Sequence, residues 1–379
     1  MYNTIRKIAL LVFLFCAHSK LSSAQDYTQY HLSINHTEEE IFVKGHIHQG
    51  LQGYVDVFKK YDFVFMGDCI IAMQLALYDN NEQVFLTVVT KAFQNGLMPR
   101  HFELHAMRYV RNHPLYTKNI DRIGKLYEAN RAHYLKRIDT VTLKKMLCLY
   151  AYDQLSKNHH PGESTPEYTL RYKPLITHTL SEVKKIIDQK GFPSDKMIGL
   201  DQDDIMCELH VDGFDAIDYY YRNKDDKRFY AAPTQFKFDE YCFSSGLYFP
   251  IVVHYVSCLD DDGEHKYSRY DKRRYLIYSD EFFMQQIKAG NVHPKDVAFL
   301  YDQGFIGYPP KPGIHGEKFF NVGTNVEYMI NQPGSISREE LNKIRAKFFI
   351  APIETDIAKY HFLKEHGMLA GTGYGGCRS

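Results

Sequence analysis

Two histidines near residue 100 have the spacing of a metal-ligand pair. His101 and His105 belong to the segment H-F-E-L-H that follows Pro99. If this segment is a helix, the two imidazoles share one face and could hold zinc. Glu103 would point away from that face, so it cannot serve as the base of an H-E-x-x-H metalloprotease site. Solvated polar histidines explain the pair more simply, and we expect no bound metal and no cofactor.

Other patterns that could carry chemistry are incomplete. The chain has no G-x-S-x-G, H-E-x-x-H or phosphate-binding P-loop motif. Residues 371–376 match G-x-G-x-x-G, but no strand precedes them and no helix follows, so we interpret residues 367–379 as a flexible Gly-rich tail. The acidic stretch 201–218 lacks the register of a calcium loop. Tyrosines within residues 219–230 could stack on a carbohydrate, although core packing explains them as well.

The N-terminus has the features of an export signal. Two basic residues precede an apolar run over residues 8–15, and the small residues Ser22 and Ala24 lie just before Gln25. The apolar run is far shorter than the roughly 20 residues that span a bilayer. We therefore expect residues 1–24 to be a secretory signal peptide, and the mature protein to be exported, periplasmic or extracellular, with no transmembrane segment.

The mature chain is almost neutral. Removing three of the 46 basic residues with the signal leaves 43, against 46 acidic residues. Nucleic-acid binding needs a clustered positive excess, so the expected partner is another protein or an envelope component. The sequence leaves the oligomeric state open. Most cysteines fit buried free thiols, and Cys242 with Cys258 is the pair that could form a disulfide.

The first half of the chain has a helical pattern. Five segments between residues 61 and 157 carry apolar residues at three- and four-residue spacing, separated by Asn, Gly or Pro. They predict a mainly α fold in which residues 25–157 form a repeat-like antiparallel bundle or short solenoid. Ahead of them, residues 40–48 indicate a short strand or a loop. Residues 158–174 are rich in proline and polar side chains, which predicts a linker.

The second half predicts another mostly helical domain, residues 175–366, with long irregular loops. A helix from Leu175 to Gln189 is closed by Gly191. A capping box, in which Ser337 is followed three residues later by a glutamate, begins a helix that runs to about Phe349. A last helix covers residues 354–365.

The stretch from Ser279 to Asp302 predicts a tight pair of helices. Ser279 is a natural N-cap, and acidic residues follow it in the first turn. Gly290 suits the left-handed residue that ends the first helix, and Pro294 suits the first position of the second. These signals specify a scaffold and name no reaction.

Several short motifs occur in one order: Asp153-Gln154, Gly191-Phe192-Pro193-Ser194, His254, a segment ending at Asp302, and Gly323-Thr324-Asn325. Over roughly residues 145–350 the chain resembles a bacterial family of unknown function, common among secreted proteins of Bacteroidetes-type organisms. That family's pattern is D-Q, G-x-P-s, Q-H, A-x-L-x-D-R and Y-G-T-Q. The chain departs from it at Val253, Gln303, Val322 and Asn325, where the pattern has Gln, Arg, Tyr and Gln.

The resemblance supplies no catalytic assignment, and our hypothesis is that the pattern residues converge. They would then line one polar pocket, formed by His254, Asp302, Thr324, Asn325, Asp153 and Gln154. Within it, His254 and Asp302 could form the acid–base pair of a hydrolase-like enzyme. The helical pattern, the near-neutral charge and the lack of a complete catalytic motif favour a scaffold or protein-interaction module instead. Carbohydrate or small-ligand binding through the tyrosine-rich stretch is the third hypothesis.

Overall fold

The computed structural model describes residues 25–104, 107–157, 160, 162–200, 279–302 and 336–368, and nine single residues at 205, 208, 209, 247, 248, 251, 252, 254 and 255. The mainly α prediction is confirmed, because these residues are mostly helical and include no strand. The choice between a bundle and a short solenoid stays a prediction. The predicted signal peptide, the tyrosine-rich stretch, the Cys242–Cys258 pair and most of the Gly-rich tail lie outside the described residues.

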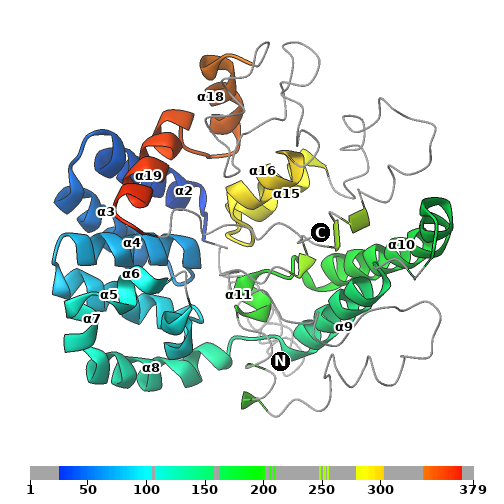
Figure 1. Cartoon of the computed structure of the whole chain (residues 1–379), viewed down its shortest axis with the longest axis horizontal. Coiled ribbons are helices and arrows are strands. Elements are labelled where there is room, and N and C mark those ends of the chain that lie inside the picture. The colour runs from blue at the N-terminus through cyan, green and yellow to red at the C-terminus, as the bar shows by residue number, and fades with distance from the viewer. Residues whose placement is uncertain are drawn as a thin grey trace, which may run out of the picture.

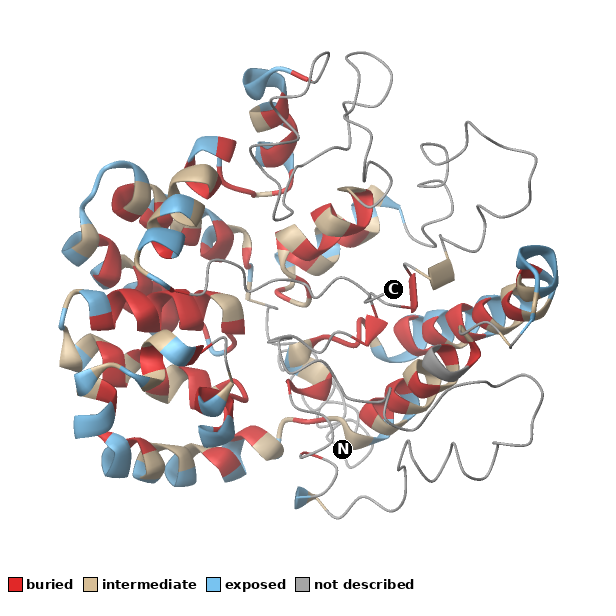
Figure 2. Ribbon diagram, viewed as in Figure 1, coloured by how far each residue is buried: buried red, intermediate tan, exposed pale blue. Residues whose placement is uncertain are grey.

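The first part of the chain packs around α4, Met66–Tyr78. This helix is apolar on nearly every side and is buried over almost its whole length, as a central helix should be. Figure 2 shows it in red among helices that are buried on one face only. The surrounding elements are α2 (Thr28–Glu38), α3 (Ile47–Lys60), α5 (Glu82–Gln94), η2 (Pro99–Glu103), α6 (Arg108–Arg111), α7 (Pro114–Lys118) and α8 (Ile120–Leu135).

The expected strand or loop at residues 40–48 is wrong. A π-helix, η1 (Glu39–Val43), extends α2, and α3 begins at Ile47. The side chain of Ile41 is buried in this turn. A Cβ atom on Gly50 would lie 2.1 Å from Ile41 Cγ1, so the glycine allows α3 to approach the π-helix closely.

Residues 165–174, expected to be linker, are helical. They form the first turns of α10 (Thr165–Lys190), which packs against α9 (Thr140–Ser156) (Figure 1). A capping box between Ser164 and Glu167 starts α10, and Pro166 fits its first turn, where a missing N–H costs little. The proline therefore marks a helix start here. The predicted helix end holds, since Gly191 has φ +92°.

The central helix pair is confirmed. The Ser279 hydroxyl accepts a hydrogen bond from the Phe282 N–H and caps α15 (Asp280–Lys288). Gly290 follows with φ +70°, and α16 (Pro294–Asp302) begins at the predicted proline. The backbone N–H of Tyr27 donates to Lys288 O at 2.8 Å, so the C-terminal end of α15 is tied to the start of α2.

The C-terminal helices return to the start of the chain. The predicted capping box at Ser337 begins α18 (Arg338–Lys347), and α19 (Ile353–Glu365) follows. In Figure 1, α19 lies against the blue helices of the N-terminal part, and Leu363 belongs to their hydrophobic core. The α9–α10 pair, in contrast, shares a second core with α15, α16 and α18. Neither core follows the predicted boundary near residues 158–174, and the division into domains stays a prediction.

Candidate functional site

Two of the residues that were predicted to converge do so. The Asp153 carboxylate, on α9, lies 2.6 Å from His254 Nδ1 through one oxygen and accepts the Tyr172 hydroxyl at 2.6 Å through the other. Asp153 is 1% exposed, whereas the His254 side chain is 12% exposed. A carboxylate oxygen accepts, so His254 Nδ1 is the donor in this contact. This is how a buried aspartate orients a histidine base.

The rest of the predicted pocket is not assembled in the described residues. Asp302 is the half-buried last residue of α16, and no described contact joins it to His254. The histidine contacts Asp153 instead, because α9 and the helical residues Ile251 and Val252 pack in the same core. Thr324, Asn325 and the Gln154 side chain lie outside the described residues.

The possible zinc pair has a different geometry from the one expected. The segment after Pro99 is a 3₁₀-helix that ends at Glu103, and Leu104 is extended, so no α-helix carries His101 and His105 on one face. His101 is buried, not solvated, and its Nδ1 accepts the Met98 N–H at 3.0 Å. His105 lies outside the described residues. Elsewhere in the part of the chain that the structure describes, no group of three side chains could hold a metal ion.

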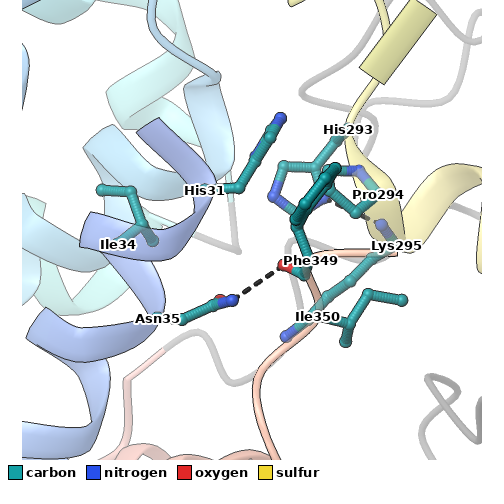
Figure 3. A pocket seen from close by; sticks show the side chains of 8 residues that line it. All are labelled: His31, Ile34, Asn35, His293, Pro294, Lys295, Phe349 and Ile350. Atoms are coloured by element: carbon teal, nitrogen blue, oxygen red, sulfur yellow. Dashed lines mark hydrogen bonds between the residues drawn. The ribbon is translucent and has the colours of Figure 1, made fainter. Parts of the chain in front are cut away.

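A small pocket that the sequence did not predict lies between α2, the start of α16 and the turn after α18 (Figure 3). Its volume is about 10 Å³, about the room that one water molecule needs. It is lined by His31, Ile34, Asn35, His293, Pro294, Lys295, Phe349 and Ile350. The Asn35 amide donates to Phe349 O at 2.7 Å across one side. The pocket therefore has room for a water and no substrate.

The two pocket histidines are kept neutral by burial. The ring centroids of His31 and His293 are 5.7 Å apart, with the ring planes nearly perpendicular. Burial lowers the pKa of His31 to about 4, and burial together with His31 holds the pKa of His293 well below its usual value. His293 Nδ1 accepts the N–H of Lys295 at 3.2 Å and so caps α16. Both rings serve to join α2 to α16.

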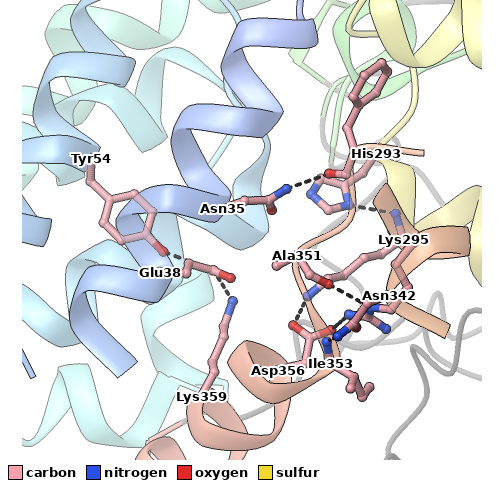
Figure 4. A network of polar contacts seen from close by, with 12 residues as sticks. Asn35, Glu38, Tyr54, His293, Lys295, Asn342, Ala351, Ile353, Asp356 and Lys359 are labelled. Atoms are coloured by element: carbon pink, nitrogen blue, oxygen red, sulfur yellow. Dashed lines mark hydrogen bonds and ion pairs between the residues drawn. The ribbon is translucent and has the colours of Figure 1, made fainter. Parts of the chain in front are cut away.

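Beside the pocket, buried ion pairs connect α2, α16, α18 and α19 (Figure 4). We call these elements and their charged residues the junction. Lys359 on α19 binds Glu38, which is 3% exposed and also accepts the Tyr54 hydroxyl at 3.1 Å. Asp356 lies 2.6 Å from Lys295 and also binds Arg345.

The charges of the junction stabilise each other. Burial favours the neutral form of Asp356, but the positive charges of Lys295 and Arg345 outweigh it and hold the pKa of this carboxyl well below its usual value. The Glu38 carboxylate similarly raises the pKa of buried Lys359. The charges are therefore paired within two groups, Glu38 with Lys359 and Asp356 with Lys295 and Arg345, which leaves them little capacity to bind a ligand.

Comparison of the chain with protein-family models, with curated proteins and with solved structures finds no match. The resemblance to the secreted bacterial family therefore stays a prediction.

Proposed function

We propose that this protein is an exported bacterial scaffold whose helices bind another protein or an envelope component. One observation carries the proposal: the junction charges pair with one another, and the pocket beside them has room for one water. Buried ion pairs that satisfy each other hold helices in place, whereas an active site needs ionisable groups that face a substrate.

Export is supported by the residue pattern over positions 1–24. Among the described helices, none is long and apolar enough to cross a membrane. The test is N-terminal sequencing of the protein recovered from the periplasm and the culture medium. A chain that begins at Gln25 supports export with cleavage. A chain that retains residues 1–24 and stays with the cytoplasm contradicts it.

Binding through the helical surface is tested at two exposed apolar side chains. Leu170 on α10 is 78% exposed and Val141 on α9 is 73% exposed, and large apolar side chains on a surface favour protein contacts. A photo-crosslinking residue at each position, in cells that export the protein, should give discrete adducts with one exported or envelope protein. Thr177, an exposed polar residue of α10, is the control position. Adducts at neither apolar position, or equally at Thr177, would contradict the proposal.

A hydrolase-like activity is the second function, and the Asp153–His254 contact favours it. The pair supplies an oriented base, and the Tyr172 hydroxyl binds the same carboxylate. The substitution His254→Asn keeps a polar side chain at this position and removes the imidazole base. Turnover of ester, amide or glycoside substrates by the wild type, lost in His254→Asn and retained in His133→Asn, an exposed control on α8, would establish the enzyme and overturn the scaffold proposal.

A further inference from the structure

Arg137, which lies between α8 and α9, has one guanidinium edge without a partner. Its Nε and Nη2 atoms are shielded from solvent and neither makes a hydrogen bond. These two nitrogens share the edge that fits two oxygens of a carboxylate or a phosphate. Buried charged donors that stay unpaired are costly. The edge therefore has the form of a binding element without its ligand.

Two other arginines show what this edge binds in the same protein. Arg131 uses Nε and Nη2 to hold Glu208, at 2.9 Å and 2.6 Å. Arg171 uses the same two atoms to hold Glu163, at 2.7 Å and 2.9 Å. Arg137 differs from both in that no carboxylate among the described residues pairs with its edge.

Two lysines add positive charge near Arg137. Burial lowers the pKa values of Arg137, Lys91 and Lys196. The positive charge of Arg137 lowers the pKa values of both lysines further. Asp62, which is exposed, is the acidic side chain that offsets this charge. The Lys91 ammonium donates to the Tyr61 carbonyl oxygen at 2.5 Å, and an ammonium group has three donors. Within the described part of the chain, these three cations have one acid near them, which leaves a local positive excess.

We call Arg137, Lys91 and Lys196 the Arg137 cluster. Aromatic rings hold two of its charged groups in place. The Arg137 guanidinium carbon lies 5.4 Å from the centroid of the Tyr134 ring, and Lys196 Nζ lies 5.4 Å from that of the Tyr27 ring. Such cation–π contacts fix the charged groups without using their hydrogen-bond donors. Lys196 is exposed, so one of the three cations lies at the surface.

We propose that Arg137, Lys196 and Lys91 form a binding site for a small oxyanion, a carboxylate or a phosphate group. The guanidinium edge binds two oxygens of the anion, and the ammonium groups supply further charge. The proposal rests on different residues from those of the scaffold proposal, so either can fail without the other.

The test is the thermal unfolding midpoint in increasing inorganic phosphate or succinate, with sodium chloride keeping the ionic strength constant. Wild type should show a saturable rise in at least one of the two anions, because a ligand that binds only the folded state stabilises it. A rise of the midpoint in phosphate alone identifies a phosphate site, and a rise in succinate alone identifies a carboxylate site. Since Nε and Nη2 are shielded, samples are equilibrated with the anion before heating. No rise beyond that in chloride would overturn the proposal.

Matched variants locate the effect. Arg137→Gln should raise the dissociation constant of the anion at least about tenfold, which is the loss of affinity expected when a charge-assisted hydrogen bond is removed. Arg137→Lys keeps the positive charge but lacks the two-nitrogen edge, so it should weaken anion binding by a similar factor. If the glutamine variant does not fold, the lysine variant tests the site in its place. Arg122→Gln, an exposed change on α8, should bind as wild type. A glutamine variant that binds as wild type would contradict the assignment.

Discussion

The junction and the Arg137 cluster both hold guanidinium nitrogens away from solvent, but the charges are paired differently. In the junction, Arg345 and Lys295 share Asp356, and Lys359 binds Glu38. Around Arg137, as far as the structure describes the chain, three cations have one exposed acid near them and the guanidinium edge has no partner. A buried charge that is paired holds elements together, whereas one that is unpaired destabilises the fold unless a ligand binds it. The same residue type therefore indicates structure in one region and binding in the other.

The largest contrast is expected from one substitution made in each region. Arg345→Met removes a fully buried partner of Asp356 and should lower the free energy of unfolding by about 3–5 kcal/mol. Arg137→Met removes an unpaired charge and keeps the apolar stem, so in chloride it should stay within about 0.5 kcal/mol of wild type or be more stable. Urea unfolding of both variants measures this. Similar losses in the two would remove the distinction between the regions.

The pH dependence should separate two buried groups with opposite effects. The pKa of His31 falls to about 4 from an ordinary 6.5, so the unfolded chain binds the proton first. Stability from this residue is complete above pH 6.5 and is lost as the pH falls to about 4, by about 3 kcal/mol. Burial raises the pKa of Asp68 from 3.8 to about 6. The folded chain then binds that proton first, and stability rises by about 3 kcal/mol as the pH falls from about 6 to 3.8.

Single variants reveal these two contributions, which largely offset each other in wild type. Relative to wild type, His31→Asn should gain stability as the pH is lowered from 6.5 to 4, and Asp68→Asn should lose it over pH 6 to 4. Unfolding free energies at several pH values measure both differences. His36→Asn, an exposed control on α2, should show neither trend. Parallel pH profiles for wild type and both variants would show that burial does not shift these groups.

A smaller effect is expected from two glycines with the same backbone conformation. Gly290 has φ +70° and Gly45 has φ +75°. A Cβ atom on Gly290 would lie 2.5 Å from the Tyr27 ring, whereas Gly45 has nothing within 4 Å. Gly45→Ala should cost about 1 kcal/mol for the left-handed backbone alone, and Gly290→Ala should cost at least about 2 kcal/mol because the ring must also move. Chemical denaturation compares them. Equal losses would show that Tyr27 adapts freely.

Local signals were enough to predict several helix ends. Ser279, Gly290, Pro294 and the capping box at Ser337 have the predicted roles, because each acts through bonds to residues a few positions away. The start of α10 was missed although the capping box of Ser164 was present in the sequence. Proline and polar residues suit both a loop and the first turn of a helix, so the prediction of a linker, which was based on composition, was wrong for residues 165–174.

The sites depended on contacts between distant residues. Glu38 and Lys359 are 321 positions apart, and nothing local in either segment indicates the pair. Asp153 and His254 were predicted to share a pocket through the family resemblance, and they do make contact, while the Asp302 partner chosen for the histidine is not the one the structure shows. The unpaired guanidinium edge of Arg137 depends on which side chains lie near it in the folded protein, and the sequence does not show this.

A double-mutant cycle between Glu38 and Lys359 tests whether the junction charges hold α19 against α2. Unfolding free energies are measured for wild type, Glu38→Gln, Lys359→Met and the double variant. We predict a coupling free energy of about 2 kcal/mol, because each single change leaves a buried charge without its partner. A coupling below about 0.5 kcal/mol would show that the two charges act independently, and would contradict the structural role assigned to the junction.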